Sequence, residues 1–295
     1  MHLFFRKNRI WLVLFVLPAT VLFLVIMVIP LVQSVYYSFF EWNGLSTVAF
    51  RGLENYQKMF TAREFGTSMT NSLIYAFVLV IYQVGMSLLL ASLLTQARIR
   101  GKQLFRNIFF VPVLLSISVV AQLWKWVYNP DYGIINRISE LLGSTWRQNW
   151  LNRPGSSLLA VAFVECWKGT GYIMLIIYAG FRNVPEVYME AAAIDGASAW
   201  QRFVHISLPL AAPTVRMTAI MCLTNGFRAF DTTWLMTKGG PGTFTYNMTI
   251  MMYNAMMTRH DYGYGSAIAV LIVVICVGIM LGLNRLTRRF DEIVV

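Results

Sequence analysis

The feature that most constrains this chain is a series of long apolar runs, each of about 20 residues and nearly free of charge. A helix of that length crosses the hydrocarbon core of a bilayer. In lipid every backbone polar group must be paired within the span, which favours helices. We therefore predict an all-α, polytopic membrane protein with six transmembrane helices in a single domain, residues 1–295. The predicted spans are residues 10–33, 73–94, 108–127, 158–181, 214–236 and 266–283.

The composition fits this class and excludes others. The chain is 57% hydrophobic and 13% charged, whereas soluble domains carry about 25% charged residues. A net charge of +11 would suit a nucleic-acid partner, but the basic residues flank the apolar runs and do not gather on a soluble face. We expect membrane lipid and no nucleic acid as a partner. Cys166, Cys222 and Cys276 all lie inside apolar runs and predict no disulfide framework or metal site.

Basic residues also predict the orientation in the membrane. A signal peptide would have a shorter apolar centre and a small-residue cleavage site, so we interpret residues 10–33 as a retained first helix. With both termini in the cytoplasm, the cytoplasmic segments are rich in Lys and Arg and poor in acid, as the positive-inside rule requires. The basic residues on that side are Arg6, Lys7, Arg9, Arg98, Arg100, Lys102, Arg106, Arg182, Arg202, Arg216, Arg285, Arg288 and Arg289.

Residues 183–210 form a polar and small-residue break between two spans. Pro185 opens a predicted helix of good helix formers that Gly196 ends with a left-handed cap. Ser198 caps a second helix, Ala199–Ile206, and Pro209 ends it. Two helices this short do not fold alone, so other parts of a larger assembly must hold them.

The same segment carries a resemblance. Glu190-Ala191-Ala192, then Asp195-Gly196, then Ile206-x-Leu208-Pro209, resembles the EAA signature of permease subunits of bacterial ATP-binding-cassette (ABC) importers. The resemblance implies the type I importer permease fold, with this loop as a cytoplasmic coupling helix that docks on an ATPase subunit. It implies a bacterial cytoplasmic (inner) membrane, two ATPase subunits that bind ATP and Mg, a second and different permease subunit, and an extracytoplasmic solute-binding protein.

Shorter runs refine the resemblance. Gly52-Leu53-x-Asn55-Tyr56, Asp131-Tyr132-Gly133-x-x-Asn136, Phe230-Asp231 and Gly239-Gly240-Pro241 are similar to the carbohydrate-uptake branch of these permeases, and to the maltose-type F subunit in particular. The implied cargo is a sugar or oligosaccharide. An acidic saccharide, a polyol or a glycerol phosphate stays open, because Lys125, Lys168 and Arg228 outnumber Glu165 and Asp231.

Polar and aromatic side chains within the spans are candidates for a solute pathway, because charges inside a membrane are costly and usually face a bundle or a wet cavity. Several recur at helical spacing of three and four residues, and Arg228 and Asp231 could pair at that spacing. They could equally lock helices together without touching solute. The candidates are Tyr75, Gln83, Gln122, Lys125, Glu165, Trp167, Lys168, Tyr172, Asn225, Phe227, Arg228, Phe230 and Asp231.

No catalytic chemistry is predicted. His2, His205 and His260 are scattered, and no GxxxxGK[ST] phosphate loop is present, so we expect no enzyme activity and no cofactor bound by this chain. A secondary transporter working alone would explain the charges within the spans as an ion relay. It would leave the EAA-like loop unexplained, and we find no internal repeat of the kind common in such carriers.

Overall fold

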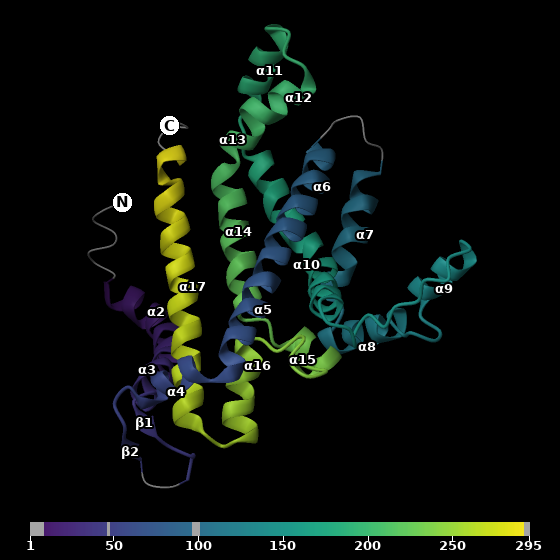
Figure 1. The fold of residues 1–295 in the computed structure, drawn as a ribbon. Coiled ribbons are helices and arrows are strands. Elements are labelled where there is room, and N and C mark those ends of the chain that lie inside the picture. The colour runs from purple at the N-terminus through teal and green to yellow at the C-terminus, as the bar shows by residue number, and fades with distance from the viewer. Residues whose placement is uncertain (1–8, 46–47, 96–100, 292–295) are drawn as a thin grey trace. The chain divides into compact units, whose positions relative to one another are not determined.

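The computed structural model describes residues 9–45, 48–95 and 101–291, which are mostly helical (Figure 1). They fall into two compact groups. Unit 1 is the described chain up to Ala62 together with Met252–Leu271, and unit 2 is Arg63–Met251 together with the described chain from Ile272. Each unit is described by itself below.

Unit 1 begins with one long helical rod. It consists of α2 (Arg9–Phe23), the π-helical turn η1 (Leu24–Val28) and α3 (Ile29–Tyr37). Proline often breaks a helix, but here the rod is continuous at both prolines: α2 continues through Pro18, and Pro30 lies in α3, which follows directly on the π-helical turn η1. The rest of unit 1 is β1 (Phe40–Glu41), which pairs antiparallel with β2 (Ala49–Phe50), then α4 (Glu54–Thr61), η4 (Asn254–Thr258) and the start of α17 (Tyr262–Asp291).

Unit 2 contains the helical bundle. Its elements are α5 (Arg63–Leu79), η2 (Val80–Val84), α6 (Gly85–Thr95), α7 (Lys102–Leu114), α8 (Ile117–Val127), α9 (Ile134–Leu141), α10 (Ser156–Arg182), α11 (Glu186–Ile194), α12 (Ala199–Arg202), η3 (Phe203–Ser207), α13 (Leu208–Leu210), α14 (Ala212–Phe227), α15 (Asp231–Thr237) and most of α16 (Met248–Tyr253), with the later part of α17.

The core of unit 2 is built around α10, which packs against α5, α6, α7 and α14. Val161, Val164 and Ile177 of α10 are fully buried. Two glycines allow the helices to approach closely, as small residues do in membrane bundles. A Cβ on Gly171 would lie 2.0 Å from the carbonyl oxygen of Phe109, and one on Gly226 would lie 2.3 Å from the Cα of Ala76.

The six predicted spans correspond to four long helices and two bent helix pairs. Four are long and apolar enough to cross a membrane, namely Val13–Tyr37, Arg63–Thr95, Ser156–Arg182 and Tyr262–Leu286. Two bent pairs raise the count to six if each is one span: Lys102–Leu114 with Ile117–Val127, bent by 99°, and Ala199–Leu210 with Ala212–Phe227, bent by 67°. The all-α, membrane-spanning class is confirmed by this architecture among the described residues.

The helices differ from the predicted spans at three places. The second helix begins at Arg63 and not at residue 73, because residues 63–72 are helical although polar. The third run breaks after Leu114, where Ser116 caps α8 by accepting a hydrogen bond from the N–H of Val119 (3.4 Å). The fifth helix ends at Phe227 and not at residue 236.

The end of α14 is fixed by a returning segment. Asn247 Nδ2 donates to the carbonyl oxygen of Ala229 (2.7 Å), and Thr249 Oγ1 donates to the same oxygen (2.5 Å). Asn71 Nδ2 on α5 donates to the carbonyl oxygens of Thr243 (3.1 Å) and Tyr246 (2.9 Å). The segment between α15 and α16 is therefore held in place by buried asparagines, and the stretch between the fifth and sixth predicted spans contains α16 and η4.

Candidate functional site

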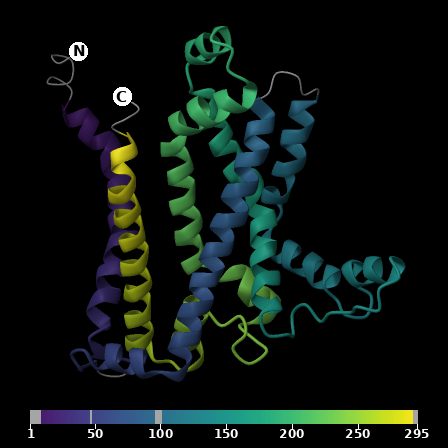
Figure 2. The same cartoon turned by 45° about the horizontal axis from the view of Figure 1, so that its top comes forward.

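The segment α11–α12 forms a tip that lies beyond the ends of α10 and α14 (Figures 1 and 2). Gly196 has a φ of +81°, which an L-residue adopts only at a cost. The N–H of Ala197 donates to the carbonyl oxygen of Ala192 (2.9 Å) and that of Gly196 to Ala193 (3.1 Å). This pair of bonds is a Schellman cap, so the predicted stop at Gly196 is confirmed.

The second helix of the tip is capped as predicted at Ser198. The hydroxyl of Ser198 accepts from the N–H of Gln201 (3.3 Å), and Gln201 Oε1 accepts from the N–H of Ser198 (2.8 Å), which completes a capping box. The predicted end at Pro209 is wrong, because α12, η3 and α13 run on to Leu210. Pro209 lies in α13, which follows directly on the π-helical turn η3 and ends one residue beyond the proline.

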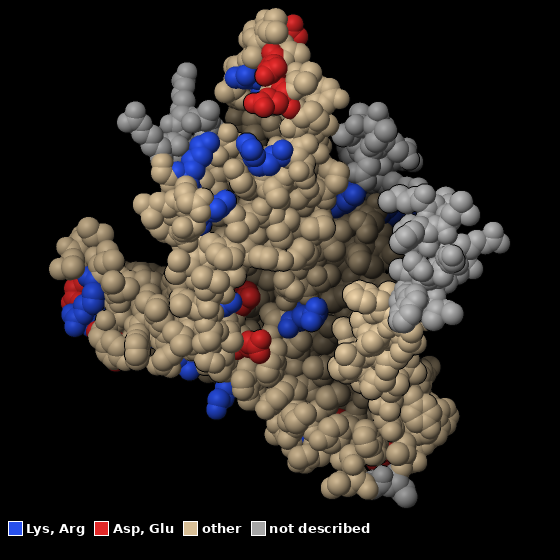
Figure 3. Space-filling model, turned by 180° about the vertical axis from the view of Figure 1, so that it is seen from behind, with Lys and Arg blue, Asp and Glu red and all other residues tan. Residues whose placement is uncertain are grey.

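The surface of the tip combines acid with exposed apolar side chains. Figure 3 shows acidic residues gathered there, and Glu186, Glu190 and Asp195 are all exposed. Three large apolar side chains are also open to solvent: Val187 is 70% exposed, Ile194 87% and Trp200 71%. Apolar side chains exposed together on a polar loop mark an interaction surface.

Several predicted pathway residues pack between helices. Gln83 is buried, and its Nε2 donates to the carbonyl oxygen of Glu165 (3.0 Å) while its Oε1 accepts from the thiol of Cys222 (3.2 Å). Glu165 accepts a hydrogen bond from Thr232 Oγ1. Tyr75 is fully buried. These contacts connect η2, α10, α14 and α15, so the predicted alternative that such groups lock helices together describes them well.

The predicted pairing of Arg228 with Asp231 is absent from the structure, and Glu165 and Lys168, which share the same spacing on α10, do not pair either. Among the ion pairs of the described residues, none joins Glu165 with Lys168 or Arg228 with Asp231. Arg228 is the C-cap of α14 and Asp231 begins α15, so the helical spacing assumed for that pair is broken.

The other candidates lie nearer the surface. Gln122, Tyr172, Asn225, Arg228 and Asp231 are exposed, and Lys125 and Lys168 are partly exposed. The ring of Trp167 meets that of Trp124 edge to face at 5.5 Å, and Phe230 stacks on Trp234 at 5.6 Å. Phe227 is buried. Their contact with a solute stays a prediction.

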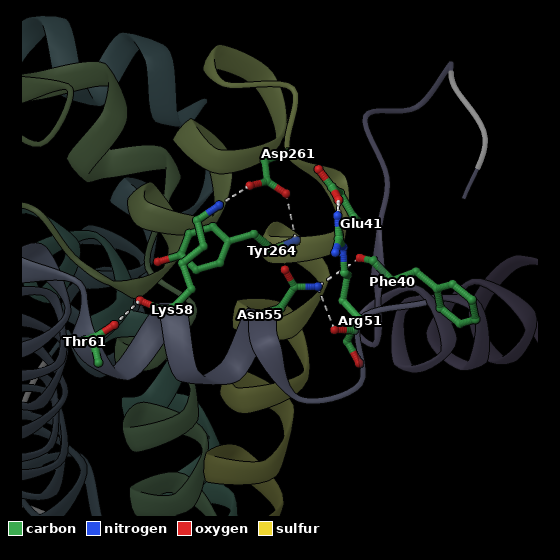
Figure 4. A network of polar contacts seen from close by, with 9 residues as sticks. Phe40, Glu41, Arg51, Asn55, Lys58, Thr61, Asp261 and Tyr264 are labelled. Carbon is green, nitrogen blue, oxygen red and sulfur yellow. Dashed lines mark hydrogen bonds and ion pairs between the residues drawn. The ribbon is translucent and has the colours of Figure 1, made fainter. Parts of the chain in front are cut away.

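Two polar pockets were missed in the sequence. Unit 1 holds one of about 580 Å³, whose lining includes Glu41, Arg51, Asn55, Lys58 and Asp261. Figure 4 shows its side chains bound to one another. Arg51 Nη2 lies 2.7 Å from Glu41 Oε2, and Lys58 Nζ lies 2.5 Å from Asp261 Oδ2. The hydrogen bond and charge of Glu41 raise the pKa of Arg51 above its usual range.

The other pocket lies in unit 2 and has a volume of about 380 Å³. Its polar lining includes Lys125, Asn129, Asn149, Asn152 and Lys238. It is formed by the end of α8, the segment before α10, and the turn after α15. The sequence shows turn-forming residues at Asn129-Pro130 and at Lys238-Gly239-Gly240-Pro241. It does not show that the two turns lie next to each other in the fold.

These observations define the class: a polytopic α-helical membrane protein with polar side chains in its bundle and a projecting helical tip suited to a partner. The chain belongs to the family described as binding-protein-dependent transport system inner membrane component, which matches residues 83–292.

Known relatives extend the match over nearly the whole chain. A probable ABC transporter permease protein, YurN of Bacillus subtilis, is 33% identical, covering 94% of this chain and 95% of its own. The trehalose/maltose transport system permease protein MalF of Thermococcus litoralis is also 33% identical, covering 89% and 88%. A solved bacterial alginate ABC transporter structure has the same fold, with a TM-score of 0.83 at 20% identity, covering 97% of this chain and 96% of the other.

Proposed function

We propose that this chain is a permease subunit that moves a sugar or oligosaccharide into the cytoplasm by alternating access, driven by a partner ATPase. The observation that carries the proposal is the tip of α11–α12, whose apolar side chains Val187, Ile194 and Trp200 lie open. Relatives named as sugar permeases, such as MalF of Thermococcus litoralis, support the choice of cargo.

The proposed assembly rests on the resemblance of the tip to the EAA loop of importer permeases. Its EAA-like residues, from Glu190 to Pro209, face the cytoplasm and dock on one of two ATPase subunits, which bind ATP and Mg. A second, different permease subunit completes the pathway, and a binding protein delivers solute from outside. Both termini lie in the cytoplasm of a bacterial cell. ATP binding closes the ATPase pair and moves the tip, and the helices then open the pathway to the outside. The chain itself performs no catalysis.

The test is ATP hydrolysis by the whole complex in lipid, assembled with its permease partner, ATPase and binding protein. Neutral saccharides, acidic saccharides, polyols and glycerol phosphate are supplied in parallel. Stimulation by one saccharide class supports the proposal. If only polyols or glycerol phosphate stimulate hydrolysis, the carbohydrate assignment is wrong while the importer stands. Uptake by this chain alone without ATP would favour a secondary transporter.

The docking role of the tip has its own test. Replacing Trp200 with Ala or Ile194 with Ser removes exposed apolar area at about 25 cal/mol per Å², and should lower solute-stimulated hydrolysis about tenfold. Met217→Ala is the control, because Met217 is also an exposed apolar side chain (49%) but lies on α14 and not on the tip. Equal effects of the control and the tip variants would contradict the docking role.

A further inference from the structure

The 380 Å³ pocket of unit 2 differs from an ordinary surface hollow because its side chains have positive charge and hydrogen-bonding groups without partners in the described chain. Neither Lys125 nor Lys238 has an ion pair within the described part of the chain. Among the described residues that line the pocket, none is acidic. Two cations therefore converge on one concavity without a carboxylate to neutralise them.

The amides around these lysines are also available. The side chains of Asn149 and Asn152 form no hydrogen bond with the described residues, and both are exposed. Asn129 uses its Oδ1 to accept from the N–H groups of Asp131 (2.9 Å) and Tyr132 (3.2 Å), which fixes the side chain and leaves its Nδ2 free to donate. Asparagine amides both donate and accept, so they match the hydroxyl groups of a polyhydroxylated molecule.

The pocket wall opposite α8 is rigid. Lys238 is a non-glycine residue with a φ of +53°, and its N–H is bound to the carbonyl oxygens of Thr233 and Trp234 (both 3.1 Å). The turn that follows is closed by the N–H of Gly240 on the carbonyl oxygen of Thr237 (2.9 Å), and by the hydroxyls of Thr237 and Thr245 at 2.6 Å. Glycine is the usual residue at such a helix end, so the lysine is held there at a conformational cost.

Size and place agree with a small-molecule site. Ligand pockets commonly measure about 300–1,000 Å³. Figures 1 and 2 place α8 and α15 at the end of unit 2 opposite the α11–α12 tip. Under the proposed orientation, that end faces outward and meets solute before the bundle does.

We propose that this pocket is an outer subsite that binds the carboxylate and hydroxyl groups of an acidic saccharide. The inference rests on the proposed function and narrows its cargo. Lys125 and Lys238 bind the carboxylate as charge-assisted donors, and Asn149 and Asn152 bind ring hydroxyls. Tyr128, buried beside them, forms part of the apolar floor.

The experiment measures sugar binding to the whole complex in nanodiscs without its binding protein, by isothermal titration. Digalacturonate is the acidic probe and maltose is the neutral probe of similar size. We expect digalacturonate to bind at least about tenfold more tightly at low salt, with the preference falling as salt screens the charges. Lys125→Gln and Lys238→Gln should each remove most of the preference, whereas Lys102→Gln, which removes the same charge from α7, should leave it intact.

The Lys238→Gly variant separates a role of Lys238 in ligand binding from a role in the stability of the fold. Glycine adopts a positive φ without strain, so this variant should melt at the same or a higher temperature while losing the preference for digalacturonate. Unchanged binding in the lysine variants, or no binding of either sugar to the parent complex, overturns the proposal.

A further outcome would reassign the pocket. If the lysine variants leave digalacturonate binding intact but require more binding protein for half-maximal ATP hydrolysis, the pocket receives an acidic side chain of the binding protein and not the solute. The titration and melting results are independent of whether saccharides stimulate hydrolysis, so failure of the subsite and failure of the sugar importer are distinguishable.

Discussion

The two polar pockets of this chain contain similar residue types but use them differently. In unit 1, Arg51 is paired with Glu41 and Lys58 with Asp261, so the charges neutralise one another. In unit 2, Lys125 and Lys238 share a pocket whose described lining has no acid. The difference teaches that polar composition alone does not mark a ligand site. What marks it is hydrogen-bonding and charge capacity that the folded chain leaves unused.

The contacts around the unit 1 pocket, whose charged side chains form ion pairs, explain how unit 1 holds together. Asn55 is buried on α4, and its Nδ2 donates to the carbonyl oxygens of Ser38 and Phe40 (both 2.9 Å). The N–H groups of Tyr262 (2.9 Å) and Gly263 (3.2 Å) donate to the carbonyl oxygen of Trp42. Lys58 also lies 4.7 Å from the centre of the Tyr264 ring, a cation–π distance. These contacts join α4, the β1–β2 hairpin and the start of α17.

The largest expected effect compares one asparagine from each pocket. Asn55→Ala removes two hydrogen bonds to buried carbonyl oxygens and should cost about 2 kcal/mol of stability. Asn152→Ala removes an exposed amide without a partner in the described chain, and should change stability by less than about 0.5 kcal/mol. The measurement is the melting temperature of the complex in nanodiscs. Equal losses would show that the two pockets do not differ as described.

An intermediate effect is expected from the charges. Asp261→Asn keeps an oxygen at Oδ1 to accept from the N–H of Tyr264 (3.1 Å) but removes the charge that faces Lys58. Because Lys58 is 56% exposed and Asp261 26%, the pair is worth about 1 kcal/mol or less. We expect a lower melting temperature for Asp261→Asn and an unchanged melting temperature for Lys125→Gln. A drop for Lys125→Gln as large as that for Asp261→Asn would give that lysine a structural role.

The sequence predicts the local structures well where one short motif is sufficient. Gly196 and Ser198 are examples, because a left-handed stop and a capping box depend on neighbouring residues alone. It also predicts the membrane class, since apolar length decides that. The sequence does not predict the end of the fifth helix. There Asn247, nearly 20 residues further along the chain, donates a hydrogen bond to the carbonyl oxygen of Ala229. The pocket of unit 2 was missed for the same reason: Lys125 and Lys238 come together only through the fold.

The smallest effect concerns Glu140, which lies outside both pockets. Arg147 donates a hydrogen bond to Glu140 (3.0 Å) and, together with the charge of Arg137, holds the pKa of Glu140 below its ordinary value of 4.5. A lowered pKa in the folded state stabilises the fold above the ordinary pKa, and this contribution is lost as pH falls through the lowered value. Because the carboxylate is exposed, the effect on melting should be barely measurable.

For this ion pair we therefore predict a change in the pKa of Glu140 without a change in stability. Arg147→Gln should raise the pKa of Glu140 toward 4.5, measured by ¹³C NMR of labelled glutamate carboxyls in the complex, while the melting temperature at pH 7 stays within experimental error. Arg63→Gln is the control for loss of a distant charge and should not move that pKa. A clear loss of stability at pH 7 in Arg147→Gln would show that an exposed ion pair outside both pockets supports the fold as much as the pairs of unit 1 do.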